Sequence, residues 1–308
     1  RDMEASKVKT KAGNKLALWG GIDTHRVLPF GTPDDVRREV RRMIDCLGKG
    51  GGYLLASVHN IQAEVPPENL AAMFDEAREY GSKLEDEKAT IVASLSSQAI
   101  RLWTEVLKTC ANKPSPLNCA DRFLTMAPVV SSRGMEHCVE FYEALLAEVE
   151  KRVKEGIGAI RDEQTRLLWD NIPPWFTLRF FNQLAARGVG FPADTYTHAW
   201  SGAVEGSDMA SILDGVVDVY SNVYLNKGLE AKVDKMCELI KDYDLDGFVM
   251  FSVRSCKRYS LGQLVSKEMV TERTGVPGVV IEGDMVDSRL FNEAQVQTRV
   301  DALLEMFV

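Results

Sequence analysis

The hydrophobic pattern of residues 15–81 predicts two consecutive strand–helix units. The apolar run KLALWGGID is the first strand, and apolar side chains then recur at helical spacing between Val36 and Leu47. Thr32 is placed to cap this helix, with Pro33 at its first position and acidic residues in its first turn. The run GGGYLLASVHNI is the second strand, and PPENLAAMFDEAREYG is the second helix. The charged segment SKLEDEKA that follows lacks periodicity, so we interpret it as a linker.

The pattern changes after this linker, first to helices and then to alternating strands and helices. Residues 90–155 are predicted to be mostly helical, with the proline-rich stretch NKPSPLNCADRFLTMAP as a loop or broken helix between two amphipathic segments. From residue 156 onward the strand candidates are RLLWDN, GVGFPADTY, DGFVMFSV and PGVVIEGD. Helices are expected to begin near Pro174, Ser207, Leu229, Ser260 and Asn292.

This order of elements predicts an α/β fold class. It comprises a helical segment, a mainly parallel doubly wound sheet with helices on both faces, and the two additional βα units at the amino-terminal side. We expect three regions, comprising residues 1–82, residues 83–155 and residues 156–308.

Composition and charge exclude several classes of function. The chain has 308 residues, of which 45% are hydrophobic, which is enough for about two domains. Its net charge of -8, with both signs interspersed, argues against a nucleic-acid partner. No apolar run reaches the ~18 residues of a membrane helix, and the first residues lack the apolar core of a signal peptide. We therefore expect a cytoplasmic protein without a membrane partner, whose six cysteines are reduced and not paired as CxxC metal ligands.

Most of the cysteines occupy positions typical of core residues. Cys110, Cys138 and Cys237 each lie at helical spacing from apolar side chains, where a free thiol packs as a small hydrophobic group. Cys46 lies at the edge of its apolar stripe, and the pattern does not place Cys119.

Cys256 differs because it follows the carboxyl end of a predicted strand and precedes a predicted helix. Open parallel sheets place their ligand crevice at such positions. Arg254, Lys257 and Arg258 would favour a thiolate there, and a thiolate is the form that binds iron–sulfur clusters. The alternative is a structural cysteine that lines a crevice.

Two histidines are candidates for chemistry. His59 closes a predicted strand, and in βα-barrels the residues at the carboxyl ends of strands carry the chemistry. His198, in DTYTHAW, also follows a predicted strand and would line the same crevice as Cys256. For each, a hydrogen-bonded structural histidine is the alternative. His25 and His137 have no supporting pattern.

Residues 84–308 resemble a subunit of the 2-hydroxyacyl-CoA dehydratase and benzoyl-CoA reductase family. The resemblance is carried by NKPSPLNCADRFLTMAPVV, RLLWDNIPPW, DTYTHAW, RSCKRYSLGQ and GVPGVVIEGDMVDSRLFNEAQVQTRVDALLEM, in that order. It implies subunits of two α/β lobes, with three cysteines holding a 4Fe–4S cluster between them. Cys256 matches the last of these ligands, and Arg254, Lys257 and Arg258 would meet the charge of the cluster or of CoA. The other two ligands belong to an amino-terminal lobe that this chain does not match.

The resemblance also implies a reaction and its partners. An ATP-dependent activator protein donates one electron, and the enzyme dehydrates a 2-hydroxyacyl-CoA thioester or, in sister enzymes, reduces an aromatic ring. The implied partners are this activator, a second dehydratase-family subunit and the CoA thioester. Asp284 and Asp287, in GDMVD, would orient groups at another strand end or would be solvated loop acids.

Residues 14–81 resemble the carboxyl-terminal end of uroporphyrinogen decarboxylase-like proteins, especially the corrinoid methyltransferase branch. The resemblance is carried by LWGGIDTHRVLPFGTPDDVRREV, GKGGGYLLASVHNI and VPPENLAAMFDEAREYG. It places His59 where relatives have a functional histidine or a zinc-binding cysteine, and it supplies about two of the eight βα units of a barrel.

Three functions therefore remain open. The chain is a cluster-dependent dehydratase-family subunit, a non-catalytic partner or scaffold subunit that binds no cluster, or a corrinoid-linked methyltransferase. In place of a closed barrel, we expect two βα units at its amino-terminal side.

Overall fold

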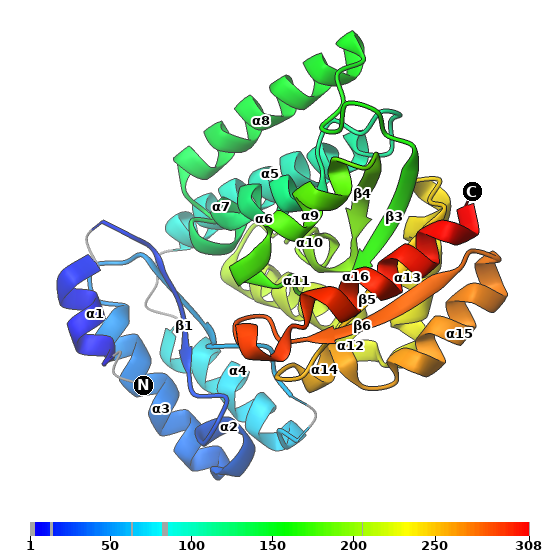
Figure 1. The fold of residues 1–308 in the computed structure, drawn as a ribbon. Helices are drawn as coiled ribbons and strands as arrows, with labels where there is room; N and C mark the ends of the chain where they lie inside the picture. Colours follow the sequence, from blue (N-terminus) through cyan, green and yellow to red (C-terminus); the bar gives the residue numbers. More distant parts are fainter. Residues whose placement is uncertain (1–3, 13–14, 63, 82–85, 205, 308) are drawn as a thin grey trace. The chain divides into compact units, whose positions relative to one another are not determined.

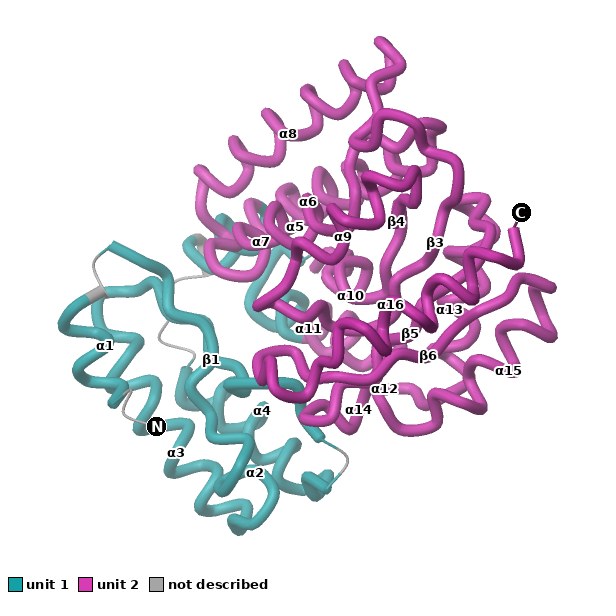
Figure 2. The backbone as a smooth tube through the Cα atoms, viewed as in Figure 1, with its two compact units in different colours: residues 1–94, 205–213 teal, residues 95–204, 214–308 magenta. Residues whose placement is uncertain are grey.

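The computed structural model describes residues 4–12, 15–62, 64–81, 86–204 and 206–307. The chain forms two compact units (Figure 2). Unit 1 comprises residues 1–94 together with 205–213, and unit 2 comprises residues 95–204 and 214–308.

Unit 1 contains a sheet of two parallel strands, β1 (Leu18–Ile22) and β2 (Tyr53–Ser57), with helices packed against it. The helices that precede and follow these strands are α1 (Ala5–Ala12), α2 (Val27–Phe30), α3 (Pro33–Leu47) and α4 (Pro67–Gly81) (Figure 1). The core of the unit is formed by apolar side chains of the strands and of α3 and α4, among them Ile22, Val36, Val40, Ala72 and Met73. The two predicted βα units are thus confirmed, and within the described part of unit 1 the sheet has these two strands.

Local chemistry sets the boundaries of these elements. The Thr32 hydroxyl accepts a hydrogen bond from the backbone N–H of Asp35 at 3.2 Å, and the Asp35 carboxylate accepts one from the backbone N–H of Thr32 at 2.9 Å. This reciprocal capping box begins α3, as predicted. Gly21 has a φ of +107°, and a Cβ there would lie 2.9 Å from the Tyr53 hydroxyl, so glycine is required where β1 approaches that ring.

The predicted linker over residues 82–89 is wrong in its second half. Residues 82–85 lie outside the described residues, but helix α5 (Asp86–Thr109) already begins at Asp86. Glutamate and lysine are good helix formers, and acidic residues suit the first turn of a helix, so a charged segment without apolar periodicity can still be helical.

Unit 2 contains a four-stranded, fully parallel sheet with the order β4-β3-β5-β6. The strands are β3 (Thr165–Asp170), β4 (Val189–Asp194), β5 (Gly247–Val253) and β6 (Gly278–Gly283). The longer helices of the unit are α8 (Glu136–Glu155), α13 (Leu229–Asp242), α15 (Gln263–Thr274) and α16 (Glu293–Leu304), together with α5 from residue 95 onward and α11 (Met209–Asn222) from residue 214 onward. The helix α9 (Arg179–Ala185) has seven residues. Shorter helices are α6 (Cys119–Thr125), α7 (Ala127–Ser131), α10 (Thr195–His198), α12 (Tyr224–Lys227) and α14 (Lys257–Ser260), with single 3-10 turns at Trp175–Thr177, Ser288–Leu290 and Glu305–Phe307.

Both faces of this sheet are covered, which confirms the doubly wound arrangement. Alternate strand residues such as Leu168 and Phe248 pack with α5, α8, α13 and α15. The residues between them, such as Trp169 and Val249, pack with α6, α9 and α16. Strands buried on both faces explain the nearly continuous apolar runs in the sequence.

Two helical segments follow Cys256. The single turn of α14 comes directly after the cysteine, and the longer helix α15 begins at Gln263, three residues after the predicted start near Ser260. The break occurs at Gly262, whose φ of +73° lies in the left-handed region.

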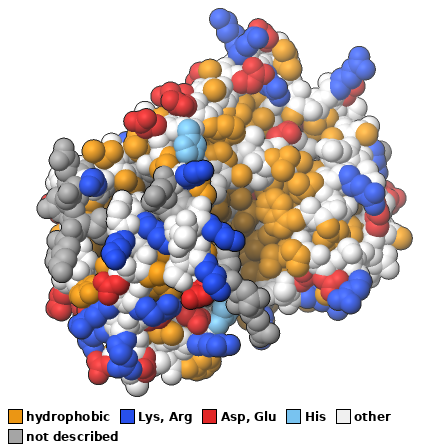
Figure 3. Space-filling view, turned by 90° about the vertical axis from the view of Figure 1, so that its left-hand side faces the viewer, with side chains coloured by type: hydrophobic (Ala, Val, Ile, Leu, Met, Phe, Trp, Pro, Cys, Tyr) orange, Lys and Arg blue, Asp and Glu red, His pale blue; other side chains and the backbone are white. Residues whose placement is uncertain are grey.

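The surface combines charged and apolar areas. On the face drawn in Figure 3, basic and acidic side chains are interspersed, and hydrophobic side chains gather over one broad area. Large apolar side chains that unit 2 exposes include Leu124, Leu261, Leu264 and Val286. In the described part of the chain, no helix combines the length and the apolarity needed to cross a membrane.

Candidate functional site

The carboxyl ends of all four strands of unit 2 lie at one edge of the sheet, because the strands are parallel. The chain leaves β3 for β4 on one side and later returns to β5 on the other side, so the strand order reverses direction between β3 and β5. Open α/β sheets bind ligands at such a switch point. We use "carboxyl edge" for the segments that follow the four strands here, which are residues 171–177, 195–198, 254–260 and 284–290.

Hydrogen bonds tie these segments to one another. The backbone N–H of Asn171 donates to the Thr195 hydroxyl at 3.1 Å. The backbone N–H of Trp175 donates to the carbonyl oxygen of Met285 at 3.0 Å. The segments of the carboxyl edge therefore form one connected layer, although they are far apart in the sequence.

Cys256 lies at the carboxyl edge directly before α14. Its backbone N–H donates to the carbonyl oxygen of Val253 at 3.1 Å, and its half-buried side chain packs against the core that includes Trp169 and Phe251. Burial raises the pKa of the Tyr196 hydroxyl to about 12, and the neighbouring Asp194 and Cys256 act in the same direction. The predicted position of Cys256 at a strand end is thus what the structure shows.

The three basic residues around Cys256 are exposed. Arg254 lies 3.7 Å from the carboxylate of Glu282, and Lys257 and Arg258 occupy the first positions of α14.

Asp284 and Asp287 shape the segment that follows β6. Burial would raise the pKa of Asp284, but hydrogen bonds from Ser255 and from the backbone N–H groups of Val286 and Asp287 outweigh it and hold that pKa below its usual value. The hydrogen bonds of Arg289 lower the pKa of Asp287 to about 2. Both carboxylates are therefore ionised acceptors that organise their own loop.

Both ring nitrogens of His198 contact groups of the chain itself. Nδ1 lies 2.7 Å from the backbone carbonyl oxygen of Asp194, and Nε2 lies 2.9 Å from the hydroxyl of Tyr243. Desolvation by burial lowers the pKa of His198 to about 4, so the ring is neutral at pH 7. Because a carbonyl oxygen only accepts, the proton of the neutral ring resides on Nδ1. The Tyr243 hydroxyl lies 2.9 Å from both Nε2 and the carbonyl oxygen of Leu107, and it has one proton to share between these two acceptors. His198 was predicted to line the crevice, and here its two ring nitrogens contact Asp194 and Tyr243.

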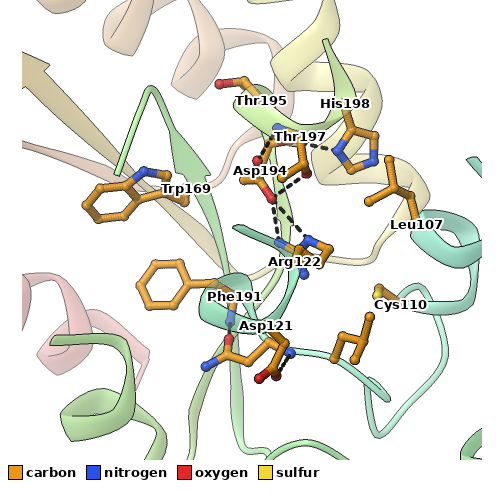
Figure 4. A network of polar contacts seen from close by, with 12 residues as sticks. Leu107, Cys110, Asp121, Arg122, Trp169, Phe191, Asp194, Thr195, Thr197 and His198 are labelled. Atoms are coloured by element: carbon orange, nitrogen blue, oxygen red, sulfur yellow. Dashed lines mark hydrogen bonds and ion pairs between the residues drawn. The ribbon is translucent and has the colours of Figure 1, made fainter. Parts of the chain in front are cut away.

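The buried ion pair of Arg122 and Asp194 was not predicted from the sequence (Figure 4). Two guanidinium nitrogens of Arg122 donate to one carboxylate oxygen of Asp194 at 3.0 and 2.8 Å, and both side chains are fully buried. Asp194 also caps α10 by accepting from the backbone N–H of Thr197 at 2.6 Å. The pair therefore fixes the start of the segment that carries His198.

A second buried ion pair lies at the end of β3. The ammonium group of Lys232, on α13, is 2.7 Å from the carboxylate of Asp170. The other carboxylate oxygen of Asp170 accepts from the Thr195 hydroxyl at 2.9 Å. A signal for both pairs was present in the sequence, because the apolar runs of β3 and β4 each end in an aspartate, and buried aspartates need partners.

The remaining cysteines are placed as core residues. Cys110, Cys119 and Cys138 are buried, and Cys46 and Cys237 are partly buried. Burial raises the pKa of the Cys110 and Cys119 thiols. Cys119, which the pattern did not place, is the first residue of α6 and belongs to the core cluster of unit 2 that includes Trp169 and Phe191.

His59 lies in unit 1, two residues beyond the end of β2. Its side chain is exposed, and its backbone carbonyl accepts a hydrogen bond from the Ser57 hydroxyl at 2.6 Å.

The described residues do not by themselves complete a metal or cluster site. Over these residues, no group of three or more His, Cys, Asp or Glu side chains gathers in a geometry that could hold a metal ion. Of the residues described at the carboxyl edge, Cys256 is the one cysteine, whereas iron–sulfur clusters take most of their iron ligands from protein cysteines.

Comparison with known proteins gives two family matches. The model of the family "2-hydroxyglutaryl-CoA dehydratase, D-component" matches residues 61–307, and the model "Uroporphyrinogen decarboxylase (URO-D)" matches residues 1–80.

Curated relatives of the first kind are subunits of CoA-dependent enzymes. The alpha subunit of (R)-2-hydroxyisocaproyl-CoA dehydratase from Clostridioides difficile is 31% identical over 77% of this chain and 59% of its own length. The alpha subunit of (R)-2-hydroxyglutaryl-CoA dehydratase from Acidaminococcus fermentans is 33% identical over 73% of this chain and 46% of its own length. A benzoyl-CoA reductase subunit from Thauera aromatica is 26% identical over 84% of this chain and 62% of its own length. The chain thus spans about half to three fifths of the length of these relatives.

The amino-terminal match is shorter. Uroporphyrinogen decarboxylase from Paraburkholderia phytofirmans is 35% identical over 24% of this chain and 20% of its own length.

Proposed function

The chain belongs to the 2-hydroxyglutaryl-CoA dehydratase D-component family, and from this premise we propose that it is a subunit of an enzyme that dehydrates a 2-hydroxyacyl-CoA or reduces a related aryl-CoA. The observation that carries the proposal is the position of Cys256. This half-buried thiol lies at the carboxyl edge, next to the switch point of a parallel sheet, where the family resemblance expects a cluster ligand.

The proposal requires further ligands from outside the described residues. A 4Fe–4S cluster would supply one-electron chemistry to such an enzyme, but the residues present do not fit a complete cluster. We propose that a partner subunit supplies the missing thiolates, and Cys256 would contribute one ligand from this side.

The surface around Cys256 supports a partner there. Leu261 is 73% exposed, and Leu264 and Val286 are each 68% exposed. Val286 lies within the carboxyl edge, and Leu261 and Leu264 come after α14 in the sequence. Large apolar side chains that remain exposed are candidates for an interaction surface. The proposed occupant is the second dehydratase-family subunit, with the ATP-dependent activator as the electron donor.

The basic residues favour a CoA thioester as the ligand. The exposed side chains of Arg254, Lys257 and Arg258 can form charge-assisted hydrogen bonds with the phosphates of CoA. In this arrangement they would bind the CoA moiety, while the half-buried Cys256 faces the reacting end.

The alternative function is a non-catalytic partner or scaffold subunit. It is favoured by the single thiolate at the carboxyl edge, since an α/β unit can pair with a complete subunit without binding a cluster of its own.

Iron and acid-labile sulfide content separates these two functions. The chain would be purified anaerobically, alone and co-expressed with a complete dehydratase-family subunit, and reconstituted with iron and sulfide. If the proposal is right, the co-expressed complex contains about four more irons than the partner subunit alone. The variant Cys256→Ser loses these irons, whereas the control Cys237→Ser keeps them. An iron content that Cys256→Ser leaves unchanged, together with intact binding to the partner, would establish the scaffold function.

A further inference from the structure

The single turn of α14 directly follows Cys256, and its buried residue Tyr259 forms hydrogen bonds with other elements of unit 2. We propose that Lys232 is a positioning residue for Cys256, because it joins the end of β3 to the backbone of α14. This inference goes beyond the proposed function. It rests on that function in one respect, because the proposed function is what makes Cys256 a cluster ligand whose position matters.

Lys232 makes two polar contacts that connect separate elements. Its ammonium group pairs with the Asp170 carboxylate at 2.7 Å and donates to the backbone carbonyl oxygen of Tyr259 at 3.0 Å. Asp170 is itself held by the Thr195 hydroxyl at 2.9 Å. One buried side chain of α13 thus links β3 to a residue three positions after Cys256.

The side chain of Tyr259 is fixed as well. Its hydroxyl lies 2.7 Å from the hydroxyl of Tyr224, which also contacts the carbonyl oxygen of Thr195 at 2.8 Å. The ammonium group of Lys232 lies 5.5 Å from the centre of the Tyr259 ring, a favourable distance for a cation–π contact. Tyr259 is therefore restrained at its backbone, its ring and its hydroxyl.

Cys256 lies between this anchor and the end of β5. On one side its backbone N–H donates to Val253, and on the other side its carbonyl oxygen accepts from the backbone N–H of Ser260 at 3.2 Å. The Ser260 hydroxyl closes the loop by donating to the carbonyl oxygen of Val253 at 2.8 Å. A loop fixed at both ends holds the thiol in one half-buried position.

Lys232 has a positioning role in addition to a stabilising one. Its loss would leave the Asp170 carboxylate buried without its counter-charge, which lowers the stability of the fold. An apolar side chain at position 232 could fill the space but could not donate to the Tyr259 carbonyl. The position therefore needs a long cationic donor that reaches both Asp170 and Tyr259.

Site-resolved alkylation of the intact, metal-free chain tests this inference. Iodoacetamide modification of each cysteine is followed by mass spectrometry in the wild type and in Lys232→Met. We expect the modification rate of Cys256 to rise at least about tenfold, as local opening of α14 becomes easier. Cys237 lies on the same helix as Lys232 and is also partly buried, so its rate, which we expect to stay within about twofold, reports any general loosening of α13.

Two matched variants complete the design. Lys235→Met removes a lysine of the same helix that pairs at the surface with Glu238 at 2.6 Å, and it should leave the Cys256 rate unchanged. Lys232→Arg keeps the charge and the donors, and it should restore most of the wild-type protection.

An unchanged Cys256 rate in folded Lys232→Met, or a parallel rise at Cys237, would overturn the inference. If Lys232→Met does not fold, Tyr224→Phe takes its place, since it removes only the hydroxyl that holds Tyr259. A rise of about threefold at Cys256 alone then supports the inference, and no change overturns it. No iron or acyl-CoA enters this assay, so failure of the proposed function would leave its result intact.

Discussion

His198 shows how its surroundings fix the protonation state of a single residue. Burial lowers its pKa from 6.5 to about 4, so the unfolded chain binds a proton at this site more readily than the folded chain does. Stability contributed by neutral His198 is therefore present above about pH 6.5 and is lost as the pH falls toward 4.

This shift predicts a specific pH dependence of unfolding. Between pH 7 and pH 5 the wild type should lose ~2 kcal/mol more of its free energy of unfolding than His198→Asn, which keeps an N–H donor for the Asp194 carbonyl but does not titrate. Urea unfolding at the two pH values measures the difference. Equal losses in both proteins would show that His198 does not stay neutral in the folded chain.

We expect a larger loss in the free energy of unfolding when the buried Arg122–Asp194 pair is broken than when His198 is protonated. Arg122→Met should lower the free energy of unfolding by ~3–5 kcal/mol, because it leaves the Asp194 carboxylate buried without its counter-charge. The double variant Arg122→Met/Asp194→Asn should recover part of this loss, since the uncompensated charge is removed.

The exposed pair of Arg187 and Asp301 provides the control for this prediction. Its two groups are 2.7 Å apart but remain partly in water, so Arg187→Met should cost less than ~1 kcal/mol. Chemical denaturation of all three variants gives the comparison. Similar losses for Arg122→Met and Arg187→Met would contradict the argument from burial.

At the scale of the elements, capping chemistry decides where α3 begins. Thr32→Ala removes the hydroxyl that accepts from the backbone N–H of Asp35 and should destabilise the first turn by ~1 kcal/mol. Hydrogen exchange of the amides in that turn should quicken in Thr32→Ala and stay near the wild-type rate in Thr32→Ser, which keeps the hydroxyl. Equal exchange in the two variants would show that the cap does not limit the opening of α3.

The elements themselves were largely predictable from local patterns. Apolar runs located all four strands of unit 2, since strands buried on both faces cannot carry polar side chains at alternate positions. The cap at Thr32 located the start of α3, and the predicted start near Asn292 agrees with α16, where the Asn292 side chain accepts from a backbone N–H group. The beginning of α5 was missed because its first residues are charged and show no apolar face.

The candidate site was less predictable, because its partners are distant in the sequence. The position of Cys256 at a strand end followed from the local pattern. Its link to Lys232 did not, because the two residues meet only after α13 and α14 pack at the same edge of the sheet. A lysine within the apolar stripe of α13 was the available signal, since lysine is rarely buried without a partner.

At the scale of the whole molecule, the chain contains two units that each have their own core. Apolar side chains of β1, β2, α3 and α4 form the core of unit 1, and the sheet of unit 2 is covered on both faces. The local pattern did not indicate that residues 205–213 belong to unit 1. This assignment depends on contacts between segments that are distant in the sequence.

The exposed apolar side chains near Cys256 lead to a prediction about assembly. Leu261 and Leu264 flank the break between α14 and α15, and in water each exposes more than two thirds of its surface. If the partner subunit covers them, Leu261→Glu/Leu264→Glu should weaken its binding at least about tenfold, since charges would be buried in an apolar contact. Ile157→Glu, an equally drastic change at an exposed position after α8, should have no such effect. Sedimentation equilibrium of the co-purified subunits measures both, with circular dichroism to confirm folding. Undiminished binding by the folded double variant would show that the partner docks elsewhere, and that another surface must supply the ligands that Cys256 lacks.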